Sequence, residues 1–113
     1  MKLNDLLRSL IEIERAASSV VEGLYTPDAV AALAERISDN SRLLRQPFGI
    51  GRTLDALRGE IAVAAESVRY AVALAAEQPE AADKRAIVVD TSRTLLGLVD
   101  RFFQAAGEKY PTR

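Results

Sequence analysis

Apolar residues recur at intervals of three and four positions in four separate stretches of the chain. The first stretch shows the pattern simply, with Leu6, Leu10, Ile13 and Val20 on one side of a helix. No stretch alternates apolar and polar residues as a half-buried strand does. We therefore predict an all-α fold, a four-helix up-down-up-down antiparallel bundle, because short connections favour antiparallel neighbours. In this single predicted domain, residues 1–113, the helices span about 4–22, 27–45, 53–77 and 80–106.

Residues that begin and end helices support these ranges. Thr26 precedes a proline and is a typical N-cap, and Asn4 is the predicted N-cap of the first helix. Gly23 and Gly107 are typical of the position after a helix C-terminus. Residues 38–41 read SDNS, and because these side chains compete for backbone hydrogen bonds, a local break in the second helix is one interpretation.

The segment PFGIGR, residues 47–52, connects the second and third predicted helices. It resembles a phosphate-binding loop only in its glycines, since it follows no strand and lacks the spacing of a P-loop. We interpret it as a turn between helices, with Phe48 or Ile50 covering the core. The alternative is an anion held at the N-terminus of the third helix, with Arg52 beside it.

The third and fourth predicted helices carry more apolar surface than one buried stripe requires. At about 100° per residue, a second row on the third helix lies opposite its core stripe, and the fourth helix has adjacent apolar pairs at heptad spacing. One interpretation is a central fourth helix with scattered exposed apolar residues on the third. We favour association with a protein through these faces. The predicted contact residues are Gly59, Val63, Tyr70 and Leu74 on the third helix and Val89, Leu96 and Phe103 on the fourth.

Composition removes most catalytic chemistry. The chain has no Cys and no His, which excludes a Cys or Ser–His nucleophile and zinc sites built from N or S ligands. No pair of carboxylates has the spacing of an acid/base site, so we expect no enzymatic activity, no cofactor and no metal. The net charge is −1 and no apolar run approaches the ~20 residues of a membrane span. We expect a cytoplasmic protein with no membrane partner.

The predicted topology sorts charge by end, although the net charge is near zero. Basic residues gather where both termini and the connection at 46–51 meet, and acidic residues such as Glu77, Glu80 and Asp83 gather at the other end. The basic end provides a second hypothesis, in which the chain binds an anion or a nucleic-acid backbone. Ordinary solvated surface charge is the alternative to both. The arginines of the second hypothesis are Arg42, Arg45, Arg52 and Arg58.

The function that this pattern favours is association. We expect a non-enzymatic protein that acts as an adaptor, chaperone, inhibitor or structural subunit. Its partner is another protein or further copies of itself, bound through the apolar faces of the third and fourth helices.

Overall fold

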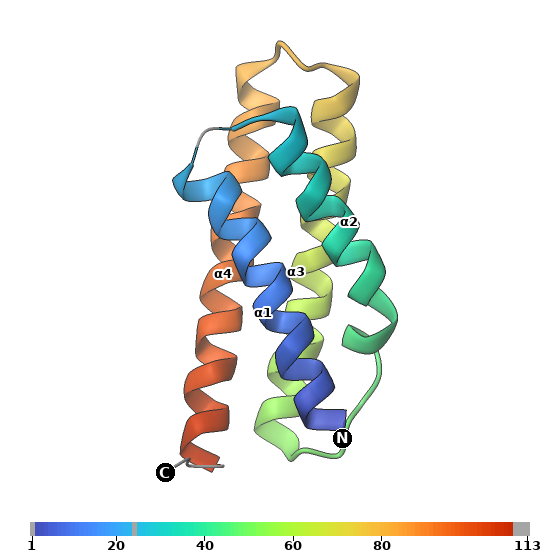
Figure 1. Cartoon of the computed structure of the whole chain (residues 1–113), viewed down its shortest axis with the longest axis vertical. Helices are drawn as coiled ribbons and strands as arrows, with labels where there is room; N and C mark the ends of the chain where they lie inside the picture. Colours follow the sequence, from blue (N-terminus) through green and yellow to red (C-terminus); the bar gives the residue numbers. More distant parts are fainter. Residues whose placement is uncertain (1, 24, 110–113) are drawn as a thin grey trace.

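The computed structural model describes residues 2–23 and 25–109, with the side chains of residues 3–23 and 25–108. Within these residues the structure contains four helices and no strand, which confirms the all-α prediction (Figure 1). The helices are α1 (Lys2–Glu22), α2 (Pro27–Leu44), α3 (Arg52–Glu77) and α4 (Ala82–Lys109).

Each helix packs against two others. The contacting pairs are α1 with α2, α2 with α3, α3 with α4 and α1 with α4, and the α3–α4 contact is the largest. The α2–α3 connection lies at the same end of the molecule as the start of α1 and the end of α4 (Figure 1). At the opposite end, the connection between α3 and α4 extends beyond α1 and α2, because α3 and α4 are the longer helices.

One apolar stripe from each helix forms the core. On α2 the buried residues are Val30, Leu33, Ile37 and Leu44, the stripe that the three-four spacing predicts. The other helices contribute Leu6, Leu10, Ile13, Leu54, Ile61, Val68, Leu95 and Phe102, all at most 1% exposed. Branched aliphatic side chains fill most of this interior, as expected for a chain in which aromatic residues are 5% of the total.

Local capping fixes the turn between α1 and α2. The Thr26 hydroxyl oxygen accepts a 3.1 Å hydrogen bond from the backbone N–H of Ala29, so the predicted N-cap is confirmed. Gly23 follows the last residue of α1, where an added Cβ would lie 2.7 Å from the carbonyl oxygen of Ser19. α2 continues without a break through residues 38–41, where the Asn40 amide donates a 2.7 Å hydrogen bond to the Arg36 carbonyl.

Three helix ends differ from the prediction by two or more residues, and the end of α2 and the start of α3 each differ by one. α1 begins at Lys2, so Asn4 lies inside the helix and is not its N-cap. α4 begins at Ala82, because residues 78–81 first form a turn closed by a 3.0 Å hydrogen bond from the Ala81 N–H to the Gln78 carbonyl. α4 also continues through Gly107 to Lys109. A glycine near a helix end costs only about 1 kcal/mol relative to alanine, which is too little to stop the helix.

Candidate functional site

The outer face of α3, which we define as Gly59, Val63, Ser67, Tyr70 and Leu74, points away from the bundle core. Val63 and Tyr70 are each 69% exposed, the highest values among the large apolar side chains that the structure describes. At about 100° per residue, they lie on the far side of the helix from Ile61 and Val68, which are fully buried. α3 therefore presents apolar residues on two sides, and only one side is covered by the described part of the chain.

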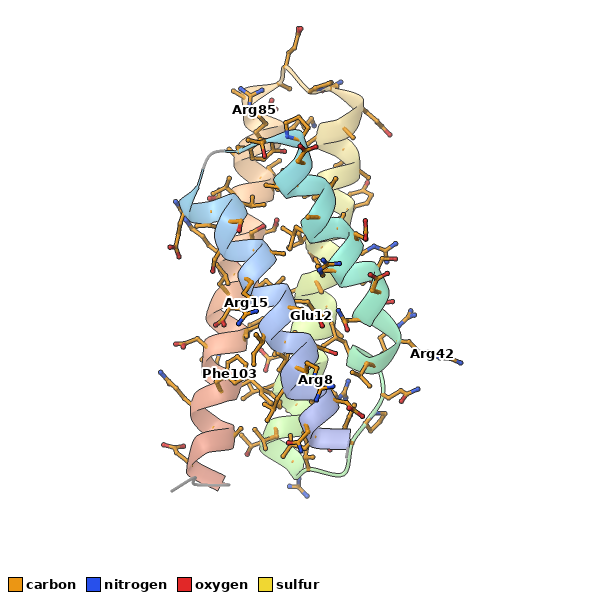
Figure 2. The ribbon with its side chains drawn as sticks, viewed as in Figure 1. Arg8, Glu12, Arg15, Arg42, Arg85 and Phe103 are labelled. Carbon is orange, nitrogen blue, oxygen red and sulfur yellow. The ribbon has the colours of Figure 1, made fainter. Side chains whose placement is uncertain are left out.

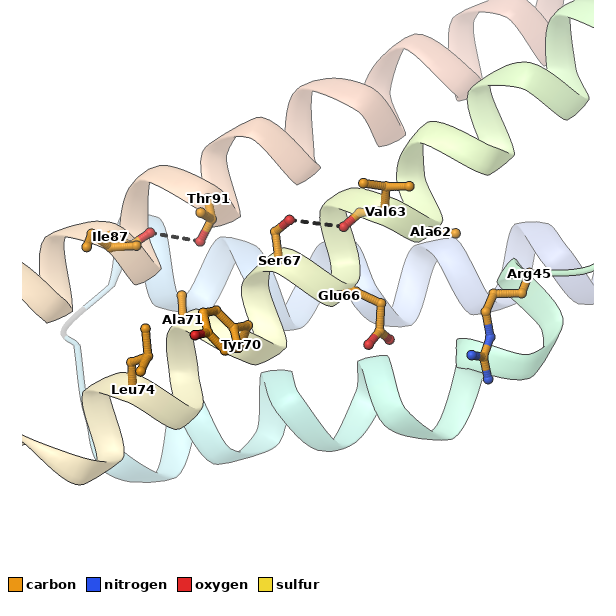
Figure 3. A pocket seen from close by; sticks show the side chains of 10 residues that line it. All are labelled: Arg45, Ala62, Val63, Glu66, Ser67, Tyr70, Ala71, Leu74, Ile87 and Thr91. Carbon is orange, nitrogen blue, oxygen red and sulfur yellow. Dashed lines mark hydrogen bonds between the residues drawn. The ribbon is translucent and has the colours of Figure 1, made fainter.

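A shallow hollow of about 650 Å³ runs along this face (Figure 3). Val63, Tyr70 and Leu74 line it from α3, and Ile87 and Thr91 line it from α4. Ile87 is 43% exposed, so three of the exposed large apolar residues gather around one hollow. The residues that complete its lining are Arg45, Ala62, Glu66, Ser67 and Ala71.

Three polar side chains in this hollow, those of Ser67, Thr91 and Glu66, already have partners within the chain. The Ser67 hydroxyl donates a 3.1 Å hydrogen bond to the Val63 carbonyl, and the Thr91 hydroxyl donates one of 2.8 Å to the Ile87 carbonyl (Figure 3). Glu66 forms a 3.0 Å ion pair with Arg69. A partner that covers the hollow therefore leaves no hydroxyl of Ser67 or Thr91 without a hydrogen bond, which removes a common cost of burial.

A second hollow, of about 580 Å³, continues the first toward the start of α3. The two hollows share Val63 and Ser67, and the second is also lined by Gly59, Thr94 and Leu98. A Cβ added to Gly59 would meet nothing within 4 Å. The outer face of α3 and the neighbouring flank of α4 thus form one continuous surface.

The structure does not bring all seven predicted contact residues together. Gly59, Val63, Tyr70 and Leu74 line the two hollows. Val89, Leu96 and Phe103 are half-buried and pack against the core cluster (Figure 2 labels Phe103). At about 100° per residue, these three lie on the flank of α4 away from the outer face of α3.

Four residues of α4 that border the outer face of α3 were absent from the predicted contact set. A signal for them exists in the sequence, because they follow one another at intervals of four, three and four positions on a single flank. They border the hollows and do not belong to the buried core. They are Ile87, Thr91, Thr94 and Leu98.

The four arginines of the anion hypothesis do not line one site. Arg45 lines the first hollow of α3, and Arg52 lines a separate one near Glu108. Arg42 is exposed and extends away from the bundle (Figure 2). Arg58 is only 9% exposed, and its guanidinium donates hydrogen bonds to the Leu44 carbonyl and to the Asp55 carboxylate. Its observed contacts are internal and join the end of α2 to the start of α3.

Asp55 is the acceptor at the centre of this junction. Its carboxylate accepts a 2.9 Å hydrogen bond from the Phe48 N–H and a 3.4 Å bond from Arg58. The Phe48 N–H lowers the pKa of Asp55, burial opposes that shift, and Arg58 and the Ile50 N–H reinforce it. Ile50 is buried and Phe48 packs against the core, so the PFGIGR segment covers the bundle end as predicted.

A further hollow of about 430 Å³ lies where α1 turns into α2, on the opposite end of the bundle from Phe48. Tyr25, Val30 and Val72 line it together with Pro79 and Arg85. Burial raises the pKa of the Tyr25 hydroxyl, and the charge of Arg85 partly offsets that shift. Arg85 also donates a 2.7 Å hydrogen bond to the Pro79 carbonyl, which closes the α3–α4 turn.

Comparison with protein-family models, with curated proteins and with solved structures finds no match for this chain. Among the residues that the structure describes, no helix has the length and apolar character needed to cross a membrane. The same residues contain no group of three or more His, Cys, Asp or Glu placed to hold a metal ion. The exposed apolar surface along α3 gathers three of the exposed large apolar side chains of the described residues, Val63, Tyr70 and Ile87, around one hollow.

Proposed function

We propose that this chain is a non-enzymatic association module that binds protein through the outer face of α3 and the adjoining flank of α4. In this proposal the helices form an up-down-up-down antiparallel bundle, and α1 and α2 hold α3 and α4 in place. The role is that of an adaptor, chaperone, inhibitor or structural subunit. The observation that carries the proposal is the exposure of Val63 and Tyr70, 69% each, beside Ile87.

The energy available from covering this surface supports the proposal. Fully burying a large apolar side chain contributes about 1.5–3 kcal/mol, and the first hollow presents Val63, Tyr70, Leu74 and Ile87 together. Tyrosine is also enriched among residues that dominate binding, because it combines a large rigid ring with a polar tip. Val63 and Tyr70 have little packing within the described bundle, whereas Val89, Leu96 and Phe103 stabilise the core.

Site-specific crosslinking in the cells that naturally produce the chain tests this proposal. A photoreactive amino acid replaces Tyr70 in the test chain. In the control it replaces Arg93, which is exposed like Tyr70 but lies on α4. We expect discrete protein adducts from position 70, and no such adducts from position 93. Val63→Glu in the position-70 chain should abolish them. Equal labelling from both positions, or no protein adduct from position 70, contradicts the proposed function.

A further inference from the structure

The outer face of α3 carries large and small residues in a self-complementary order. Gly59 and Leu74 lie at equal distances from the point between Glu66 and Ser67, and so do Val63 and Tyr70. If two copies of α3 pack antiparallel about a two-fold axis at that point, Gly59 of one copy faces Leu74 of the other. Val63 likewise faces Tyr70. An interface that repeats the same surface on both copies has this property.

No contact within the described chain requires a glycine at position 59. An alanine Cβ at this position would meet nothing within 4 Å, and glycine inside a helix costs about 1 kcal/mol relative to alanine. The absence of a side chain at Gly59 leaves space on the helix surface, in the hollow of about 580 Å³ that Gly59 lines. In the antiparallel arrangement this hollow would receive Leu74 of the second copy, which is half-buried in its own chain.

The charges at the two ends of α3 also favour the antiparallel orientation. Arg52 lies at the first position of α3 and Glu77 at the last, and neither forms an ion pair with a described residue. In the symmetric pair, Glu77 lies level with Ala56 of the second copy. That level is one helical turn, about 6 Å, from the partner's Arg52. Glu80 adds to the acidic end of α3 and Arg45 adds to the basic end. A parallel pair would therefore place like charges together.

We propose that the partner of the outer face of α3 is a second copy of this chain, packed antiparallel about a two-fold axis between Glu66 and Ser67. This inference rests on the proposed function and names its partner. At the axis the Ser67 hydroxyl keeps its bond to the Val63 carbonyl. The two Glu66–Arg69 ion pairs lie on the same rim and form a charge-neutral cluster, so no charge is buried alone.

Disulfide trapping tests the axis directly, because the natural chain has no cysteine. In this register the two copies of residue 67 lie on the same face of the helix pair and only one position apart, so helices packed at the closer end of the usual range of about 8–10 Å bring them near the ~3.5–4.5 Å Cβ separation of a disulfide. The test variant is Ser67→Cys. The matched control is Ser19→Cys, since Ser19 is also exposed and also donates to the carbonyl four residues before it. We expect the Ser67→Cys covalent dimer to form about a hundredfold faster than the control, given the effective concentration within a complex. Equal rates overturn the inference.

Sedimentation of the purified chain at concentrations up to about 1 mM separates this inference from the proposed function. We expect a monomer–dimer equilibrium in the natural chain and a monomer for Gly59→Leu, with helix content unchanged because the site has room within its own chain. A natural chain that stays monomeric, or that grows beyond a dimer, overturns the two-fold pairing. The proposed function then stands if position 70 still crosslinks to a different protein in cells, and both fail if it crosslinks to none.

Discussion

The carboxylate of Asp55 accepts a 2.9 Å hydrogen bond from the backbone N–H of Phe48, seven positions earlier in the chain. This bond ties the connection between α2 and α3 to the first turn of α3. Asp55 also receives the buried Arg58 guanidinium, which in turn donates to the last carbonyl of α2 at Leu44. The end of the bundle is therefore held by one acid and one base whose partners lie within the fold.

We expect Asp55→Asn to lower the free energy of unfolding by about 1 kcal/mol at neutral pH. The folded protein holds the pKa of Asp55 below its usual value, mainly through the Phe48 N–H. The stabilisation is therefore present above the unfolded pKa of about 4 and is lost as the pH falls through the folded pKa. Urea unfolding at several pH values should show the difference from the natural protein shrinking in acid. Asp90→Asn is the matched control, since the Asp90–Arg93 pair has the same spacing but is exposed.

We expect Arg58→Met to lower the free energy of unfolding by about 2 kcal/mol. The substitution keeps much of the aliphatic stem but leaves the Leu44 carbonyl and the Asp55 carboxylate without their guanidinium donor. Arg52→Met, at an exposed arginine, should change stability by less than about 0.5 kcal/mol. Equal effects of the two substitutions in chemical denaturation would contradict the internal role of Arg58.

Glycine-to-alanine substitutions at two positions should change the free energy of unfolding in opposite directions. At Gly23 the new Cβ meets the Ser19 carbonyl oxygen at 2.7 Å, so we expect a loss of about 1–2 kcal/mol in unfolding free energy. At Gly97, inside α4, the Cβ meets nothing within 4 Å, and we expect a gain of about 1 kcal/mol. Thermal and urea unfolding of both variants provide the measurement, and a gain at Gly23 would show that this close approach does not constrain the turn.

We expect Ser92→Ala to raise the free energy of unfolding by about 1 kcal/mol. The Ser92 side chain is fully buried, and its hydroxyl has no hydrogen-bond partner among the described residues. Removing a buried hydroxyl without a partner removes its desolvation cost. Urea unfolding measures the change, with Ser19→Ala as a control whose hydroxyl is exposed and bonded and lies away from the outer face of α3. Destabilisation at Ser92 would show that its hydroxyl finds a partner in solution.

Periodicity predicted the helices and the core because packing follows the side-chain repeat directly. The only continuous apolar row on α2 consists of Val30, Leu33, Ile37 and Leu44. The sequence therefore allows only one buried face for this helix. The ends of α1 and α4 were harder to predict. Capping signals differ from continued helix by only about 1 kcal/mol, and the helix passes through both Asn4 and Gly107.

The surface of α3 could be predicted where a second apolar row faces away from the core, as Val63 and Tyr70 do. The same reasoning could not sort the two flanks of α4. Leu96 and Leu98 are both apolar neighbours of the buried stripe, and the sequence alone does not say which flank borders the outer face of α3. Arg58 shows a similar limit, since its burial depends on the position of the Leu44 carbonyl, 14 residues earlier in the chain.

Reversing the charge at one end of α3 should weaken the symmetric dimer, and reversing the charges at both ends should restore it. Arg52→Glu alone, or Glu77→Arg alone, places like charges one turn apart at both ends of the interface, and we expect the dimer dissociation constant to rise about fivefold. The double variant re-forms both pairs in reverse, so its dissociation constant should return to within about twofold of the natural value. Arg15→Glu and Glu35→Arg, on α1 and α2, make the same changes in net charge away from α3 and control for overall repulsion. Sedimentation equilibrium measures each constant, and a double variant as weak as either single variant would rule out contact between opposite ends of α3.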